Sequence, residues 1–471
     1  MLFRGRNVQD EVVVQLNKSW IDGFLGSRIS MVLACTLYVA VFVLVYERVI
    51  VPLWEYMGFH SRTTLSHAAV GWVLAALPSL WMPIKLKRPS QIVYWLLYLL
   101  VVVPACLVPI YSLEDQSSGP LIFAVSIVGT FALTGVIYRL PLVPLPRMRL
   151  ESYEFKVLLA LMSVVCYALM MASFGLQLHY VSFENTYSVR AEFTDTLSRV
   201  PPPVAYAIGW QAWVINPFMM SMGLRSRRVS WVLAGAAGEL AIYSITAFRA
   251  MFFAVGLLFY LLWAMRSNKA FGTRLAGSWT AIFAGAGALQ LLGYGVIPIS
   301  LVGERMTAIP GLLTGYYYDF FSSHPQVHLG HSILKSLVSY PYAAEPQKII
   351  GSLYFHNATN ANANLWADAY ANFGYAGIFW FTLLLAIVLW LYDSMAVGRD
   401  MLLAALVIGL PAFALANGGL LTCLLSNGMG LAMLLVYLVP PTTYEKSRDP
   451  AAERGCFTRA IGQRGTIQSS H

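Results

Sequence analysis

Long apolar runs, separated by short polar or basic segments, dominate the pattern of this 471-residue chain. About 20 apolar residues in helical conformation cross the hydrocarbon core of a bilayer. Each run therefore predicts one membrane-spanning helix, because a helix satisfies its backbone hydrogen bonds internally in lipid. The predicted spans are residues 30–48, 67–84, 91–112, 121–138, 157–175, 204–222, 230–247, 250–265, 276–297, 368–391, 401–416 and 421–440. These twelve runs indicate an all-α polytopic membrane protein with a single transmembrane bundle over residues 30–440.

The composition agrees with this fold class and excludes a soluble globular protein. Hydrophobic residues make up 58% of the chain and charged residues only 11%, whereas soluble proteins carry roughly 25% charged residues. The aromatic content of 14% suits two belts of aromatic side chains at the membrane surfaces. Two assignments stay open: only Arg249 separates the seventh and eighth spans, and the last two spans are short enough to be re-entrant.

Basic residues divide unevenly between the two sides of the predicted bundle. One side carries most of them, including Lys85, Lys87, Arg88, Arg225, Arg227 and Arg228. Cytoplasmic loops are enriched in Lys and Arg, so we expect the N-terminal segment, residues 1–29, and the polar tail, residues 441–471, to be cytoplasmic. The net charge of +9 mainly reflects this bias, and no basic, aromatic-rich polar domain indicates a nucleic-acid partner.

Two predicted outer segments are long, residues 176–203 and 298–367. Long loops in compact proteins tend to be functional or disordered, and the second segment is too aromatic to be disordered. Within it, GYYYDFF at 315–321 and HSILKSLVSYPY at 331–342 predict short helices lying on the outer membrane surface. All histidines except His471 also fall on the outer side or at its interface, so we expect any chemistry at the outer face.

Three arginines of the predicted outer side are candidate ligands for phosphate: Arg190, Arg249 and Arg305. Guanidinium is a planar fork that stays charged and binds phosphate oxygens bidentately. The alternative is an arginine that snorkels to the interface from a helix end. For Arg249, between two apolar helices, a functional role is favoured because ionisable groups at such a depth are costly.

A polar run, HNATNANANLWADAYANFGYAG at 356–377, leads directly into an apolar helix. The Asn364 amide is both donor and acceptor, and the Trp366 ring offers a stacking surface for a sugar. Asp368 or His356 could accept a proton from an attacking hydroxyl. The alternative is an ordered loop that caps the helix, with Asn364 or Asp368 as the N-cap.

Two further patterns have chemical and structural interpretations. Glu239 lies inside a predicted span, where a carboxyl is either functional or an internal hydrogen-bonding group. His324, His328 and His331 have a spacing that would suit a metal on a helix, but a polar interfacial face is the favoured interpretation. The sequence has no Asp-x-Asp pair of the kind that holds a metal-bound nucleotide sugar, so we expect no metal site.

Four segments together resemble the bacterial O-antigen polymerases, the Wzy-type oligosaccharide repeat-unit polymerases. They are TYSVRAEF around Arg190, TAFRAMFF around Arg249, GERMTAIPGLLTGYYYDFFSSHP around Arg305 and NLWADAYANFGYAGIFW at 364–380. Each motif is loose, but their order and spacing, the twelve-span plan and the large late outer loop extend the resemblance over most of residues 150–440.

The resemblance implies an inverting, metal-independent glycosyl transfer without a cofactor at the periplasmic face of the bacterial inner membrane. The donor would be a growing glycan on undecaprenyl diphosphate, and the acceptor a repeat unit on the same lipid carrier. Membrane lipid and a chain-length regulator protein are the other implied partners. The roles assigned on this basis are diphosphate binding by Arg190, Arg249 and Arg305, base catalysis by Asp368 or His356, and sugar contact by Tyr317, Asn364 and Trp366.

Two other interpretations share these features. In the related O-antigen ligases a His-Asn pair precedes a Gly-x-x-Gly, as His356-Asn357 precedes Gly374-x-x-Gly377 here, although the gap in this chain is longer. A lipid-linked-oligosaccharide flippase or transporter would share the spans and the outer cations. Such a protein would usually show paired broken helices and inverted repeats, and neither is clear in this sequence.

Overall fold

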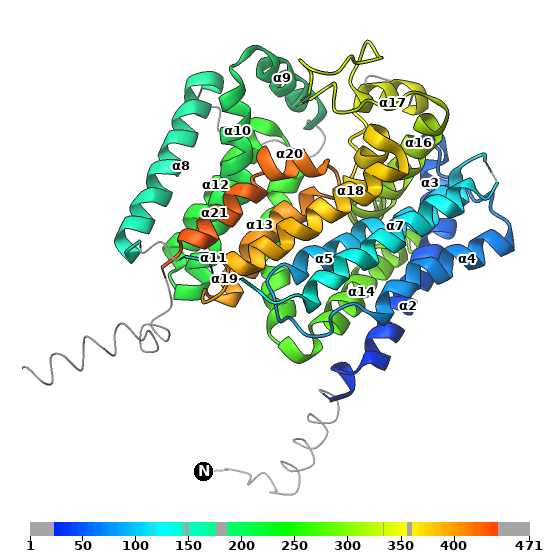
Figure 1. Ribbon diagram of the computed structural model, residues 1–471, viewed down its shortest axis with the longest axis horizontal. Coiled ribbons are helices and arrows are strands. Elements are labelled where there is room, and N and C mark those ends of the chain that lie inside the picture. Colours follow the sequence, from blue (N-terminus) through cyan, green and yellow to red (C-terminus); the bar gives the residue numbers. More distant parts are fainter. Residues whose placement is uncertain are drawn as a thin grey trace, which may run out of the picture.

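The computed structural model describes residues 23–115, 117–143, 145–146, 150–175, 186–332, 334–355 and 360–440 (Figure 1). Every regular element within these ranges is a helix, which confirms the all-α fold class. The predicted tail, residues 441–471, and most of the predicted N-terminal segment lie outside the described residues. The cytoplasmic location of both therefore stays a prediction.

Seven helical stretches in the described ranges are long and apolar enough to cross a membrane. They are α2–η2 (Arg28–Met57), α5–α6 (Gln91–Ser112), α7–η5 (Gly119–Arg139), α8 (Ser152–Phe174), α12 (Val229–Thr246), α18 (Leu365–Met395) and α20–α21 (Leu420–Leu438). These seven stretches indicate a membrane protein.

The remaining predicted spans also fall on helices, but these are shorter or bent. α13 (Arg249–Met265) and η7–α14 (Asn268–Leu291) form a pair bent by 102°. The others are α4–η3 (Leu65–Leu80), α10 (Pro202–Trp210), η6 (Gln211–Ile215), α11 (Asn216–Ser226) and α19 (Met401–Ala414). Helices thus lie at all twelve predicted ranges, whereas the number that cross the membrane stays a prediction.

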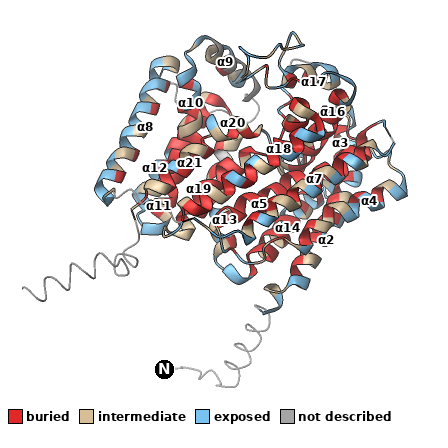
Figure 2. Cartoon of the chain, in the orientation of Figure 1, coloured by how far each residue is buried: buried red, intermediate tan, exposed pale blue. Residues whose placement is uncertain are grey.

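Burial distinguishes the centre of the bundle from its edge (Figure 2). The most apolar part of α5–α6 is entirely buried, whereas only 17% of the corresponding part of α8 is buried. Leu161 and Val164 on α8 are exposed apolar side chains. A helix of this kind suits contact with lipid chains, which are as apolar as leucine, so α8 forms the edge of the bundle.

The segment Ile297–Ser323 is made of α15 (Ile297–Ile299), η8 (Ser300–Ala308) and α16 (Ile309–Ser323). Its two ends are exposed, but its middle packs against other helices of the bundle. A Cβ atom at Gly311 would lie 2.6 Å from the Pro104 carbonyl oxygen, and one at Gly315 would lie 3.2 Å from Pro109 Cβ. These two contacts advance in the same direction, so α16 runs parallel to α6 (Val103–Ser112).

The predicted helix on the outer membrane surface at 315–321 is therefore wrong. Its tyrosines and phenylalanines fill the space between helices, and Tyr317 and Phe321 are buried. Glycines let the backbone approach the prolines of α6, which is a matter of tertiary packing rather than local pattern. As η8 contacts η4 (Tyr98–Val102), Glu304 and Arg305 lie beside the middle of the helix Gln91–Ser112.

The second predicted surface helix, at 331–342, is also wrong, because its described residues form turns and bends. The preceding residues follow α18 instead: the Val327 amide donates to Ala371 O at 3.0 Å, and the Leu329 amide donates to Asn372 Oδ1 at 2.8 Å. α17 (Pro346–Phe355) completes this outer region.

The three closely spaced histidines of this region have separate aromatic neighbours, because residues 324–331 are not helical. The rings of His324, His328 and His331 pack on Phe320, Phe373 and Tyr340, respectively. Burial lowers the pKa of His331, and nearby Glu345 partly offsets this. The helical spacing that would suit a metal is therefore not formed.

Candidate functional site

Arg249 is placed by a sharp turn between α12 and α13. α12 ends at Thr246, and Ala247 adopts a left-handed conformation with φ 52°. The Phe248 amide then donates to Thr246 Oγ1 at 3.2 Å, and Arg249 is the first residue of α13. A cation at a helix N-terminus is opposed by the helix dipole, so this position suits an arginine only where an anion lies close.

Glu304 provides a buried carboxylate beside Arg249. Its side chain is 4% exposed and accepts a hydrogen bond from Ser300 Oγ at 2.6 Å. Arg305 and Arg249 both lie within electrostatic range of this carboxylate. Two of the three predicted phosphate ligands, which are more than fifty residues apart in sequence, therefore lie near the same acidic group.

Arg190 joins this neighbourhood through an aromatic ring. It is an exposed residue of α9 (Thr186–Arg199), and its guanidinium carbon lies 4.8 Å from the centre of the Phe248 ring. A guanidinium over an aromatic face at this distance is a favourable cation–π contact, worth about 0.5–1 kcal/mol when exposed. Phe248 and Glu304 thus bring Arg190, Arg249 and Arg305 into one region, which we call the arginine cluster.

The backbone under the arginine cluster is a π-helix, η8, nine residues long. The wider turn of the π-helix also shows at Thr307. Its hydroxyl donates to Val302 O, five residues earlier, at 2.9 Å, and also to Gly303 O. π-Helical turns are uncommon and frequently lie at functional sites. Neither η8 nor the role of Glu304 was predicted; the acidic-basic pair Glu304-Arg305 within an apolar stretch was the available signal.

The polar run before α18 has a different role from the predicted one at Asn364. Its side chain is wholly buried and caps α18, accepting from the Trp366 and Ala367 amides at 3.0 and 3.1 Å. It also donates to Thr314 Oγ1 at 2.6 Å and to Pro310 O at 3.1 Å. The alternative interpretation, Asn364 as the N-cap, is confirmed.

Trp366 and Tyr317, the other predicted sugar contacts, are also interior groups. Trp366 is 0% exposed and donates from Nε1 to Thr382 Oγ1 at 2.9 Å. Tyr317 is 2% exposed and donates to Ala361 O at 2.9 Å. With Asn364, they hold the start of α18 against its neighbours, and no ring face or amide is open to a sugar in this conformation. Helix capping and close packing explain these residues better than sugar contact.

Asp368 lies in the first turn of α18 and is partly exposed. Asn372 Nδ2 donates to Asp368 Oδ1 at 3.3 Å, and the carboxylate lies directly against Gly419, where a Cβ atom would collide with it. α18 then breaks, since Phe373 and Gly374 leave helical geometry and Gly374 has φ 60°. The described contacts of Asp368 are thus with α18 and the turn before α20 (Leu420–Leu425), rather than with the arginine cluster. His356, the other base candidate, lies outside the described residues.

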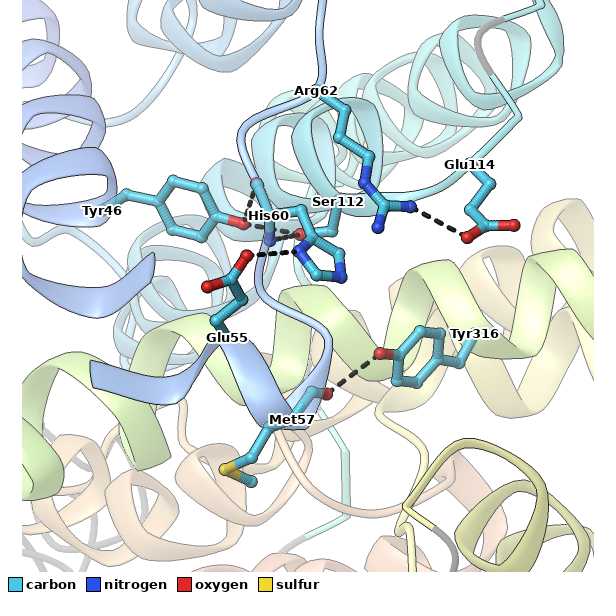
Figure 3. A network of polar contacts seen from close by, with 8 residues as sticks. All are labelled: Tyr46, Glu55, Met57, His60, Arg62, Ser112, Glu114 and Tyr316. Carbon is cyan, nitrogen blue, oxygen red and sulfur yellow. Dashed lines mark hydrogen bonds and ion pairs between the residues drawn. The ribbon is translucent and has the colours of Figure 1, made fainter. Parts of the chain in front are cut away.

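A separate polar network joins α2–η2, α6 and α16 (Figure 3). Tyr46 Oη lies 2.5 Å from Ser112 Oγ and donates to His60 O at 3.0 Å, and Tyr316 Oη donates to Met57 O at 3.0 Å. These bonds fasten the connection between η2 and α4 to its neighbours, which is a structural role.

Arg62 in the same network shows a contrasting environment for an outer arginine. Its Nη1 lies 3.0 Å from Glu114 Oε1, and both side chains are well exposed. An exposed pair of this kind contributes at most about 1 kcal/mol. Arg62 therefore differs from Arg249 and Arg305, which lie within electrostatic range of the buried carboxyl group of Glu304.

Glu239 is fully buried inside α12, next to the Asn216 side chain. Asn216 Oδ1 accepts from Gln211 Nε2 at 2.6 Å and from Tyr167 Oη at 3.2 Å. Both Glu239 oxygens are otherwise without a hydrogen-bond partner among the described residues. The side chains of Tyr167, Gln211, Asn216 and Glu239 thus form a polar cluster between α8, η6, α11 and α12.

Comparison of the chain with protein-family models, with curated proteins and with solved structures finds no match.

Proposed function

We propose that this protein polymerises lipid-linked oligosaccharide repeat units, as in the assembly of an O-antigen or a similar surface polysaccharide. The glycan donor is carried on undecaprenyl diphosphate, and transfer takes place at the periplasmic face of a bacterial inner membrane. The observation that supports this proposal is the grouping of Arg190, Arg249 and Arg305 around Phe248 and Glu304.

The reaction explains why several arginines would gather at one place. The acceptor hydroxyl attacks the anomeric carbon, the bond from that carbon to the diphosphate oxygen breaks, and the electron pair stays on the leaving diphosphate. Negative charge therefore develops on the diphosphate in the transition state, where preorganised cations stabilise it most. Bidentate guanidinium–phosphate bonds also orient the lipid-borne donor.

The α12–α13 turn supplies part of such an anion site without any side chain. Arg249 opens α13, so the first amide groups of that helix and the guanidinium lie at the same end. Helix N-termini bind phosphate through these amides and through the helix dipole. Glu304 would hold the Arg249 and Arg305 side chains in position until the diphosphate binds.

The proton of the acceptor hydroxyl needs an acceptor group. Asp368 is the candidate within the described residues, because it is partly exposed and its carboxylate keeps acceptor capacity beyond the bond from Asn372. Its contacts differ from those of the arginine cluster, so acceptor and donor sites would be formed by different helices. A D368N substitution then tests the base, while arginine substitutions test the leaving group.

The test uses purified protein in lipid nanodiscs with a diphosphate-linked repeat unit, without nucleotide sugar or added metal. A ladder of longer lipid-linked glycans is expected. If no ladder formed and intact substrate moved between the leaflets of proteoliposomes, the proposal would be overturned in favour of a flippase. Transfer only to an added lipid A acceptor would instead indicate a ligase.

The arginine cluster is tested with R249A, and R62A serves as the matched control. Loss of a hydrogen-bonded charge that contacts the leaving group costs about 2.7–4 kcal/mol in comparable sites, or 100- to 1,000-fold in rate. R249A should lower the rate of ladder formation by that factor, and a size-exclusion profile matching the unaltered protein should show that the variant is folded. R62A should leave the rate unchanged, and equal rates for both variants would remove Arg249 from the site.

A further inference from the structure

A cavity of about 280 Å³ opens between α8, α11, α12 and α19, at the ends of these helices that the charge bias places in the cytoplasm. Lys156, Arg225 and Arg228 line it, together with Ser152 and Trp231. None of these residues belongs to the arginine cluster, which lies on the predicted outer side. The cavity is therefore a second basic site of the molecule.

The three cations of the cavity differ in their partners. Arg225 Nε lies 2.7 Å from Asp400 Oδ2, so that guanidinium already faces a carboxylate. Lys156 and Arg228 form no ion pair with any described residue. Glu151 and Glu154, near Ser152 in sequence, are engaged in the capping box of α8. The cavity thus offers two positive charges to an incoming anion.

The backbone adds to this positive character. α8 begins at Ser152 and α12 begins at Val229, directly after Arg228, so both helices direct their N-terminal amides towards the cavity end of the bundle. Helix N-termini carry partial positive charge and unsatisfied amide donors. The capping box already occupies amides at the start of α8, so the two side-chain cations and the start of α12 are the groups that suit a phosphate.

The rest of the lining is apolar except for Ser226. Phe155, Met222 and Leu403 form the apolar part with the chain after α21. α8, which supplies Phe155, is the helix with exposed apolar side chains along its length. The volume lies below the roughly 300–1,000 Å³ of pockets that enclose whole drug-sized ligands. The cavity therefore suits a headgroup whose chains remain outside, along α8.

We propose that this cavity binds the phosphate headgroup of an anionic glycerophospholipid from the cytoplasmic leaflet. Lys156 and Arg228 contact the phosphate, Trp231 lies at the level of the glycerol, and the acyl chains follow the exposed face of α8. Basic pockets between membrane helices on the cytoplasmic side recognise anionic lipid headgroups in this manner. The proposal is independent of the reaction at the arginine cluster.

The test measures binding of phosphatidylglycerol to detergent-purified full-length protein by native mass spectrometry. Phosphatidylcholine is the neutral comparison. The K156Q/R228Q double variant removes both charges, and K269Q removes an exposed charge from the same predicted side outside the cavity. Each basic residue near a lipid phosphate contributes about a fivefold change in binding, so the double variant should bind phosphatidylglycerol roughly 25-fold more weakly. K269Q should bind like the unaltered protein.

Three results would overturn the proposal. They are equal binding of phosphatidylglycerol by the double variant and the unaltered protein, equal binding of phosphatidylcholine and phosphatidylglycerol, and displacement of the lipid by millimolar inorganic phosphate. The last result would indicate a site for a soluble anion. Retained ladder formation by the double variant would show that it is folded, and a size-exclusion profile matching the unaltered protein provides the same check without activity.

Discussion

At the scale of single residues, the main feature is that Glu304 lies beside two arginines within the bundle. A carboxylate removed from water is costly unless cations or hydrogen bonds compensate it. Ser300 donates a hydrogen bond to this carboxylate, and the charges of Arg305 and Arg249 offset part of the remaining cost of burial. The arginines in turn need an anion at this depth. We therefore regard Glu304 as a positioning residue for the arginine cluster.

Removal of this negative charge has an expected outcome. In E304Q the Ser300 bond can persist, but the negative charge that attracts Arg249 and Arg305 is lost. Thermal denaturation in detergent should therefore show a loss of stability greater than about 1 kcal/mol, the upper limit for an exposed pair. Added diphosphate-linked substrate should restore part of it, because the substrate supplies the missing negative charge.

The matched control for E304Q is E114Q, which removes the carboxylate of the exposed Arg62 pair. That change should alter stability by less than about 1 kcal/mol, and substrate should have no special effect on it. If E304Q and E114Q behaved alike, Glu304 would have no role in holding the arginines.

At the scale of elements, the start of α18 depends on one amide. Asn364 closes the helix N-terminus and links it to the Pro310–Thr314 turn of α16. Gly374 then breaks α18 after its first two turns. The first turns of α18, which include Asp368, are thus held in place by α16 as well as by the rest of α18.

The N364A substitution tests this dependence. Loss of the cap costs about 0.5–2 kcal/mol, and the unsatisfied partners left behind add about 1–3 kcal/mol. The thermal midpoint of N364A should fall accordingly, whereas N362A, at an exposed position of the same segment, should remain within about 0.5 kcal/mol of the unaltered protein. Equal midpoints for the two variants would contradict the capping role.

At the scale of the whole molecule, the charge bias makes a prediction about orientation. We expect R62C to react with a membrane-impermeant maleimide from the periplasmic side of intact spheroplasts, because Arg62 is exposed and lies on the predicted outer side. K269C should react only after permeabilisation. The described native cysteines Cys35, Cys106, Cys166 and Cys423 are buried and should contribute little background. Reaction of K269C in intact spheroplasts would reverse the topology.

Much of the fold follows from local pattern, because an apolar run long enough to span a bilayer has few alternatives to a helix. The grouping of the arginines was also foreseeable, since charged groups within an apolar bundle usually pair with one another or line one functional site. The packing of residues 297–323 against other helices was not foreseeable. The glycines and aromatic residues of this segment suit a helix on the membrane surface equally well. Only the fit of Gly311 and Gly315 against α6 shows that the segment packs within the bundle.

The same ambiguity applies to the polar run before α18. Asparagine, tryptophan and aspartate suit a sugar site and a capped helix start alike, and the contacts of Asn364 with Thr314 and Pro310 select the second role. Such contacts join segments distant in sequence, so no local pattern reveals them. Asp368 keeps its candidate role because the structure leaves it partly exposed.

The parallel packing of α6 and α16 also has a consequence for biosynthesis. The contact between Gly311 and Pro104 joins residues about 200 positions apart, so α6 is synthesised and inserted long before its partner exists. Until then the flank of α6 that carries Pro104 and Pro109 lacks the partner that α16 later provides. The arginine cluster includes η8, directly before α16, and so forms late during synthesis. A ribosome-bound chain that ends before Ile297 would already contain Arg190 and Arg249, but neither Glu304, which lies near Arg249, nor Arg305.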